Sequence, residues 1–211
     1  PVSAPPPQGA AMLSSLPRWY ANGGVARFAW DGTLPLMHVR GPAVLSTLYL
    51  LACAAHNQRR LRKPLAPSAV LDVAAVLHNA LLAAFSVVAC ASGSYYLGIK
   101  LHQSGIHNFL CPPLPQGPQA ATPAPLDGPL HGWCYIFYLS KYWELLDTVL
   151  LISRGKRVIF LHAFHHAMMP PLMAALFQGR VSISLVALTI INGFVHIVMY
   201  SYFTLSALHL R

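Results

Sequence analysis

Residues 158–177 read VIFLHAFHHAMMPPLMAALF and place His162, His165 and His166 inside a stretch that is otherwise apolar. At about 100° per residue, imidazoles with this spacing lie within roughly a 100° arc of one helical face. Ionisable side chains in an apolar helix are costly and indicate a functional site by default. The stretch therefore predicts a membrane helix with titratable groups on one face, whose partners must come from other segments.

The composition also indicates a membrane protein. Of the 211 residues, 55% are hydrophobic and only 9% are charged, and the mean hydropathy is +0.51. A soluble domain carries about 25% charged residues. The formal charge of +9 is not read as a nucleic-acid signal, because the basic residues form short clusters between apolar runs. The four cysteines have irregular spacings and match neither a zinc pattern nor a disulfide framework.

The fold class predicted is all-α, a polytopic membrane helix bundle. Five apolar segments are expected to be its transmembrane helices, and they cover residues 42–55, 69–92, 131–153, 158–177 and 181–208. Residues 1–41 are expected to form a disordered and interfacial N-terminal segment, and residues 93–130 a long loop. Pro170 and Pro171 must kink the fourth segment or break it in two.

Basic clusters orient this bundle. Residues 59–63 and 154–157 are rich in arginine and lysine, which places both turns on the cytosolic side. The N-terminal segment and the 93–130 loop then lie on the opposite side. The histidine cluster is expected one to two turns inside the membrane from the cytosolic face.

The third segment carries charges of both signs. Lys141, Glu144 and Thr148 fall within roughly 60° of one another on a helix, with Asp147 on the flank. Exposure of these charges to lipid would cost several kcal/mol, so they must face the bundle interior and each other. They either form a buried ion pair that fixes helix register or serve as acid/base or histidine-orienting groups.

The fifth segment adds another histidine. Asn192, His196, Met199, Tyr200 and Phe203 share one helical face. A lone histidine there would more often be a core residue, but the histidines and carboxylates of the neighbouring segments favour a functional role. In the second segment, His78 and Asn79 are ambiguous.

Two kinds of chemistry could use these groups. Histidine boxes on membrane helices bind two irons in desaturases and hydroxylases, but that needs about eight histidines in several boxes, and this chain has one HxxHH. Histidine can also form an acyl-enzyme and move protons near neutral pH, oriented by a carboxylate. A transporter with an intramembrane proton relay is the non-enzyme alternative.

Three motifs in series complete the pattern: KxxExxDT at Lys141–Thr148, HxxHH at His162–His166 and NxxxHxxMYxY at Asn192–Tyr202. In this order they resemble the ELO family of very-long-chain fatty acid elongases, from about residue 42 to 208. An Asn79…Ser86 pairing is also similar to that family. Phe203 departs from the family's usual tyrosine, which removes a hydroxyl.

The resemblance implies a seven-helix, multi-pass protein of the endoplasmic reticulum membrane with its active site towards the cytosolic side. Five helices are expected here, so the ELO-type domain of residues 42–211 would be C-terminally incomplete. The chain begins at Pro1, which suggests a fragment or trimmed product. The implied partners are acyl-CoA, malonyl-CoA, the bilayer and the reductase and dehydratase of the elongation cycle, with no nucleic acid. A homo-oligomer is compatible with the family.

The implied reaction joins a long-chain acyl-CoA and malonyl-CoA into a 3-oxoacyl-CoA, with release of CO₂ and CoA. No cofactor or metal is expected. His165 is the expected nucleophile and His196 the proton donor to the leaving thiolate or a malonyl-positioning group. The other expected catalytic residues are His162, His166, Glu144, Asp147 and Lys141. The expected substrate-binding residues are Asn192, Tyr200, Thr148 and Asn79.

Overall fold

The computed structural model describes residues 24–30, 34–36, 38–58, 64, 68–111 and 126–208. Within these ranges the chain is almost entirely helical and forms no strand, apart from an isolated antiparallel bridge between Ala29 and Asp127. The all-α prediction is confirmed for this part of the chain. The elements are η1 (Gly24–Arg27), α3 (Arg40–Gln58), α4 (Ser68–Leu110), α5 (Gly128–Trp143), α6 (Leu145–Ser153), α7 (Phe160–Gln178) and α8 (Ser182–Ala207).

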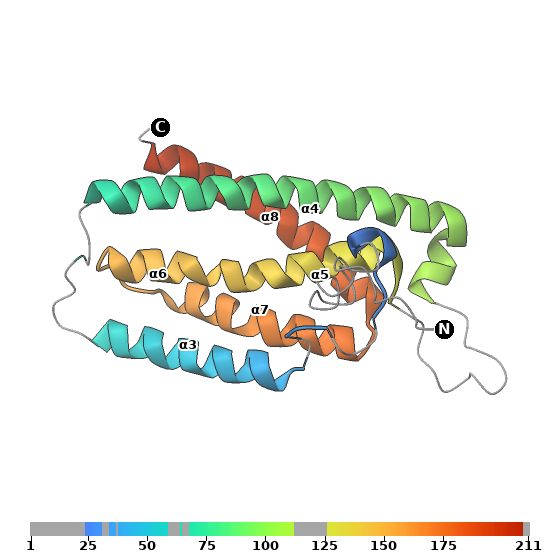
Figure 1. Cartoon of the computed structure of the whole chain (residues 1–211), viewed down its shortest axis with the longest axis horizontal. Helices are drawn as coiled ribbons and strands as arrows, with labels where there is room; N and C mark the ends of the chain where they lie inside the picture. The colour runs from blue at the N-terminus through green and yellow to red at the C-terminus, as the bar shows by residue number, and fades with distance from the viewer. Residues whose placement is uncertain are drawn as a thin grey trace, which may run out of the picture.

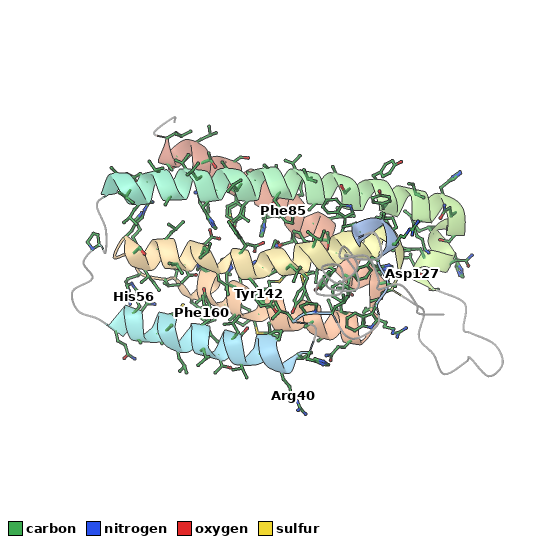
Figure 2. The ribbon with its side chains drawn as sticks, viewed as in Figure 1. Arg40, His56, Phe85, Asp127, Tyr142 and Phe160 are labelled. Carbon is green, nitrogen blue, oxygen red and sulfur yellow. The ribbon has the colours of Figure 1, made fainter. Side chains whose placement is uncertain are left out.

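The helices form one elongated bundle. α3, α4, α7 and the α5–α6 pair run lengthwise, and α8 crosses α4 obliquely (Figure 1). α3 packs on α7, α4 packs on α8, and α5 contacts α4, α7 and α8. Side chains fill the space between these helices, whereas Arg40 at the start of α3 points away from the bundle (Figure 2). The elements that carry the sequence motifs, α5, α6, α7 and α8, are therefore neighbours.

Three predicted segments match helices within a few residues. They are 42–55, 158–177 and 181–208, which correspond to α3, α7 and α8. The expectation that two prolines break the fourth segment is wrong, because Pro170 and Pro171 both lie inside the single helix α7. Neither proline donates a backbone hydrogen bond, so the carbonyls of His166 and Ala167 lose their usual helical partners.

The loop predicted at residues 93–130 is wrong at both ends. α4 continues to Leu110 and α5 begins at Gly128. Gly93, which suggested a loop, instead allows α4 to approach α8. The break in α4 comes at Gly105, whose φ of 74° is a conformation that glycine adopts without steric cost. The proline-rich residues 112–125 lie outside the described ranges.

The third predicted segment is one rod with a local irregularity. Residues 128–153 are helical except at Glu144, which separates α5 from α6. The amide of Asp147 donates to the carbonyl of Glu144 at 3.0 Å, a bond to the third residue back that tightens the turn. Glu144 and Asp147 are thus displayed from an irregular turn in the middle of the rod.

Small residues let α4 and α8 pack closely. A Cβ added to Gly193 would lie 3.4 Å from Cβ of Cys90, and one added to Gly93 would lie 3.4 Å from the side chain of Ile190. Small residues at such crossings allow close backbone approach. This contact fixes α8, and with it His196, against the rest of the bundle.

The described part of the N-terminal segment packs onto one end of the bundle. Phe28 and Leu34 are buried in the core. Trp30 N donates to Leu126 O at 3.0 Å, and Gly128 N donates to Phe28 O at 2.8 Å. Residues 1–23, where disorder was expected, lie outside the described ranges, and the domain boundary at residue 41 stays a prediction.

Two helices are long and apolar enough to cross a membrane. By length and composition these are residues 69–110 of α4 and Ser182–Ala207, the whole of α8. α5 and α6 have 16 and 9 residues, each shorter than the roughly 20 that a span needs, because Glu144 divides them. Their joint length, 128–153, is sufficient.

The opposite end of the bundle is tied together by side-chain contacts with backbone. His56 Nε2 donates to Lys156 O at 2.8 Å, and the Asn57 amide exchanges two hydrogen bonds with the backbone of Val158. Arg154 bonds Asp72 Oδ1 at 2.6 Å near the start of α4. The end of α3, the start of α4 and the 154–157 turn therefore lie together, while the basic residues 59–63 lie outside the described ranges.

Candidate active site

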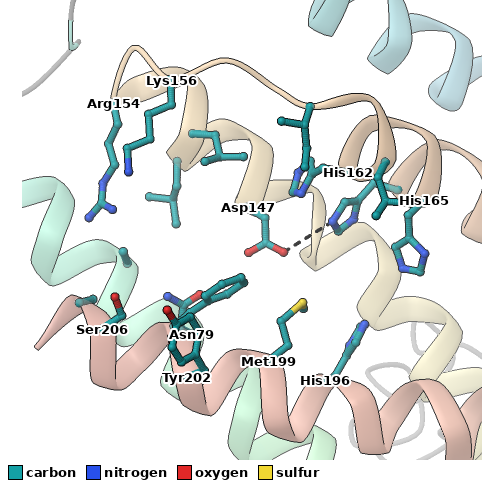
Figure 3. A pocket seen from close by; sticks show the side chains of 18 of the residues that line it. Asn79, Asp147, Arg154, Lys156, His162, His165, His196, Met199, Tyr202 and Ser206 are labelled. Atoms are coloured by element: carbon teal, nitrogen blue, oxygen red, sulfur yellow. Dashed lines mark ion pairs between the residues drawn. The ribbon is translucent and has the colours of Figure 1, made fainter. Parts of the chain in front are cut away.

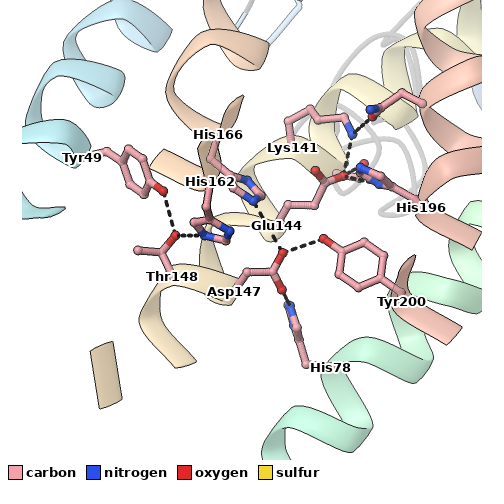
Figure 4. Close-up of polar contacts among 12 residues, drawn as sticks. Tyr49, His78, Lys141, Glu144, Asp147, Thr148, His162, His166, His196 and Tyr200 are labelled. Atoms are coloured by element: carbon pink, nitrogen blue, oxygen red, sulfur yellow. Dashed lines mark hydrogen bonds and ion pairs between the residues drawn. The ribbon is translucent and has the colours of Figure 1, made fainter. Parts of the chain in front are cut away.

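A buried ion pair joins α5 to α8. Lys141 Nζ lies 2.7 Å from Glu144 Oε1, and both side chains are 1% exposed. The ammonium also donates to Asn192 Oδ1 at 2.8 Å and lies 4.0 Å from the centre of the Phe137 ring. Loss of one partner of such a pair leaves an uncompensated buried charge. Lys141, Glu144 and Asn192 thus form one electrostatic unit (Figure 4).

Two histidines from different helices meet this unit. His196 Nδ1 on α8 lies 3.4 Å from Glu144 Oε1, and the rings of His196 and His165 are 6.4 Å apart. Glu144 Oε2 and His196 Nδ1 are buried without a hydrogen-bond partner within the described residues. A buried polar atom left unpaired costs about 1–3 kcal/mol. Such atoms are common where a site awaits a group from outside.

These three residues match the donor set of a metal site by type. One ligand atom each from Glu144, His165 and His196 lies within 4.8 Å of the others. Two histidines and a glutamate suit zinc. However, the ammonium of Lys141 already occupies Glu144 Oε1 at 2.7 Å and would repel a cation placed there. The expectation that no metal is used stays a prediction.

Asp147 is the centre of a second unit. Its Oδ1 accepts from His78 Nε2 at 2.8 Å, and its Oδ2 accepts from the Tyr200 hydroxyl at 2.6 Å. His166 Nε2 lies 3.7 Å from the same Oδ2. Three helices, α4, α7 and α8, therefore converge on this one carboxylate of α6 (Figure 4).

Thr148 forms a third unit with α3 and α7. Its Oγ1 lies 2.8 Å from the Tyr49 hydroxyl and 2.8 Å from His162 Nε2. The His162 ring lies 4.4 Å from that of His166, and the His166 ring lies 5.5 Å from that of His165. The histidine cluster is therefore continuous from Thr148 to the Glu144 unit.

A cavity of about 760 Å³ borders all three units. His165 and His196 lie at one end, and Arg154 and Lys156 lie at the other (Figure 3). Arg154 is held in place by Asp72, which also lines the cavity. The volume and the charged end suit a ligand with an anionic part and a reactive group some distance away.

The predicted site residues fall into two sets. Those that line the cavity are Asn79, Asp147, His162, His165, His166, Asn192 and His196. Those buried behind it are Lys141, Glu144, Thr148 and Tyr200. Two of the residues predicted to bind substrate, Thr148 and Tyr200, use their hydroxyls within the protein. The role of every residue in both sets stays a prediction.

Sequence reasoning missed two members of the network. His78 was ambiguous, although an ionisable residue next to Asn79 in an apolar helix was a usable signal. Tyr49 gave no signal, because a tyrosine in the short apolar run of α3 is unremarkable. Only the packing of α3 on α7 brings it to Thr148.

Comparisons with known proteins agree with these motifs. Residues 34–211 match the family model described as ELO: GNS1/SUR4 family. The chain is 32% identical over 182 residues to fatty acid elongase sre1 of Dictyostelium discoideum, which covers 84% of this chain and 63% of that protein. It is 28% identical over 193 residues to fatty acid elongase A of the same organism, with 86% and 62% covered. The chain thus spans less than two thirds of these relatives. No solved structure matches.

Proposed function

The chain belongs to the ELO family, and from this premise we propose that it is the condensing enzyme of fatty-acid elongation. The proposed reaction joins an acyl-CoA to malonyl-CoA and releases CO₂ and CoA, leaving a 3-oxoacyl-CoA. Relatives named as fatty acid elongases support elongation in general and do not favour the desaturase or transporter alternatives. The observation that carries the finer proposal is the meeting of His165 and His196 beside Glu144 on one cavity.

The first proposed half-reaction forms an acyl-histidine. A ring nitrogen of His165 attacks the thioester carbon, the carbon–sulfur bond breaks, and CoA leaves after taking a proton. Neutral imidazole is a competent nucleophile near neutral pH. His165 is the proposed nucleophile because it lines the cavity and reaches neither Asp147 nor Thr148 by hydrogen bonds in the described structure.

The second proposed half-reaction makes the new carbon–carbon bond. Malonyl-CoA loses CO₂, and the carbanion that remains attacks the acyl carbon on His165. The carbon–nitrogen bond then breaks, which restores the imidazole and yields the 3-oxoacyl-CoA. No redox step or cofactor is needed, because both substrates arrive as activated thioesters.

His196 is proposed to handle the proton and the malonyl unit. It lies beside both His165 and the Glu144 carboxylate. The carboxylate stabilises a proton held on His196 and orients the ring. Lys141 offsets the charge of Glu144 when His196 is neutral. Asp147 is proposed to orient His166 in the same way across 3.7 Å.

The basic end of the cavity is proposed to bind the CoA phosphates. Lys156 and Arg154 line it, and lysine and arginine make charge-assisted bonds to phosphate. In this arrangement the thioester reaches the histidines while the nucleotide stays at the 154–157 turn (Figure 3).

The membrane setting is part of the same proposal. We infer five transmembrane helices, α3, α4, the α5–α6 rod, α7 and α8, within a seven-helix protein of the endoplasmic reticulum. Outward-facing apolar side chains on α3 and α8, such as Val44, Leu51, Ile191 and Phe194, suit a lipid environment. The 154–157 turn would face the cytosol, where CoA substrates, the reductase and the dehydratase are met.

Intact-mass analysis of the full-length protein tests the mechanism. Incubation with acyl-CoA alone should add one acyl group, and His165→Ala should abolish the adduct. His102→Ala is a matched control, because His102 is exposed on α4. A wild-type protein that never gains an acyl group, or a His165→Ala variant that still does, would contradict the assignment.

A further inference from the structure

The hydrogen-bond chain from α3 to the histidine cluster has a direction. A threonine hydroxyl has one hydrogen to donate, and Thr148 Oγ1 has two partners, Tyr49 and His162, each at 2.8 Å. One partner must therefore donate to Thr148 while the other accepts from it, if every hydrogen in the chain is to be used.

Tyr49 is the better donor of the two ends. A phenolic hydroxyl is more acidic than an aliphatic one and accepts hydrogen bonds less readily. In the reverse direction, His162 would donate through Thr148 to Tyr49, and the phenol hydrogen would need another acceptor. The other group beside that hydroxyl is the Cys53 thiol, whose sulfur accepts only weakly. The chain therefore runs from Tyr49 to Thr148 to His162 Nε2.

This direction fixes the tautomer of His162. A neutral imidazole that accepts at Nε2 carries its proton on Nδ1. His162 Nδ1 makes no hydrogen bond within the part of the chain that the structure describes, and the side chain lines the cavity. We propose that Tyr49 is a positioning residue which, through Thr148, holds His162 as an Nδ1–H donor for a substrate oxygen.

The consequence is a division of labour within the HxxHH motif, and this role in the reaction rests on the proposed function. His162 cannot offer Nε2 as a nucleophile, because Thr148 occupies it. It instead supplies a hydrogen bond to the thioester or malonyl oxygen while His165 attacks. The contact comes from α3, outside the three motifs, so it links the first helix of the bundle to the chemistry.

Imidazole nitrogen NMR of the full-length protein in lipid nanodiscs tests the tautomer directly. With ¹⁵N-labelled histidine, the His162 signals are identified by difference from a His162→Gln sample. The expected wild-type spectrum shows His162 protonated on Nδ1. Tyr49→Phe and Thr148→Val should move these signals towards a tautomer mixture, whereas Thr148→Ser should keep the wild-type pattern because it retains the hydroxyl.

Kinetics give the second readout. Tyr49→Phe should lower kcat about tenfold with little change in KM, the scale of one well-placed hydrogen bond. Tyr95→Phe is the matched control, because Tyr95 is 65% exposed on α4. A wild-type His162 protonated on Nε2, or a Tyr49→Phe spectrum identical to wild type, would overturn the proposal. The spectra do not require turnover, so an inactive but correctly polarised protein would refute the proposed function alone.

Discussion

The carboxylate of Asp147 on α6 accepts a hydrogen bond from Nε2 of His78 on α4, 2.8 Å away. Its second oxygen is bonded to Tyr200 on α8 at 2.6 Å. A carboxylate in an apolar bundle is stable only when its oxygens are satisfied. His78 therefore links the second apolar segment to the acidic rod and holds Asp147 facing the cavity.

Replacement of His78 by alanine should destabilise the protein. The change removes one of two hydrogen bonds to Asp147, and a bond to a charged group contributes about 1.5–3 kcal/mol. Thermal unfolding in detergent should show a lower Tm than wild type. His102→Ala, at an exposed position of α4, should leave the Tm unchanged. Equal Tm values for the two variants would show that the His78 contact does not stabilise the fold.

The path from His78 to Asp147 shows what sequence could reach. Helical periodicity located α3, α7 and α8 and grouped Lys141 with Glu144, because both follow from local spacing. It could not say which face of α4 meets Asp147, nor that Tyr49 meets Thr148. Those contacts depend on the order in which the helices pack, which a single sequence does not encode locally.

The errors have local causes as well. Glycine and serine near residue 93 suggested a loop, but Gly93 is where α4 approaches Ile190 of α8. The proline pair suggested a break, but α7 continues through it. In both cases tertiary packing outweighed local propensity.

The Lys141–Glu144 pair should be conditional on both partners. Lys141→Met alone leaves Glu144 buried and uncompensated, a change that costs about 3–5 kcal/mol in comparable buried pairs. The double variant Lys141→Met/Glu144→Gln should recover part of that loss, because no net charge remains buried. Denaturant unfolding of all four members of the double-mutant cycle measures the coupling. A double variant less stable than Lys141→Met would contradict this account.

The close crossing of α4 and α8 should tolerate no large residue at Gly193. Its missing Cβ would already lie 3.4 Å from Cβ of Cys90 and 3.8 Å from the Phe137 ring. Gly193→Leu should therefore displace α8 and destabilise the protein by about 1–3 kcal/mol, the usual cost of overpacking. Displacement of α8 would also carry His196 away from Glu144.

Gly98→Leu is the control for that crossing. Gly98 lies in α4 with nothing within 4 Å of an added Cβ. Leucine has a higher helix propensity than glycine, so this variant should be as stable as wild type or slightly more so. Thermal unfolding of both variants measures the difference. A Gly98→Leu variant as unstable as Gly193→Leu would show that the α4–α8 crossing is not the cause.

Charge reversal at the turn between α6 and α7 separates substrate binding from topology. Lys156 lines the cavity, whereas the adjacent Arg157 lines a different, smaller depression with Phe160 and Ala163. Lys156→Glu and Arg157→Glu change the net charge equally and sit in the same turn. If Lys156 meets CoA phosphates, Lys156→Glu should raise KM for malonyl-CoA or acyl-CoA about tenfold, the effect of one lost charge-assisted bond. Arg157→Glu should leave KM near the wild-type value, because its side chain does not line the cavity. Initial-rate measurements with each CoA substrate distinguish the two. Equal increases in KM for both variants would indicate that the turn acts only through its overall field, and that the phosphates do not bind at the Lys156 end of the cavity.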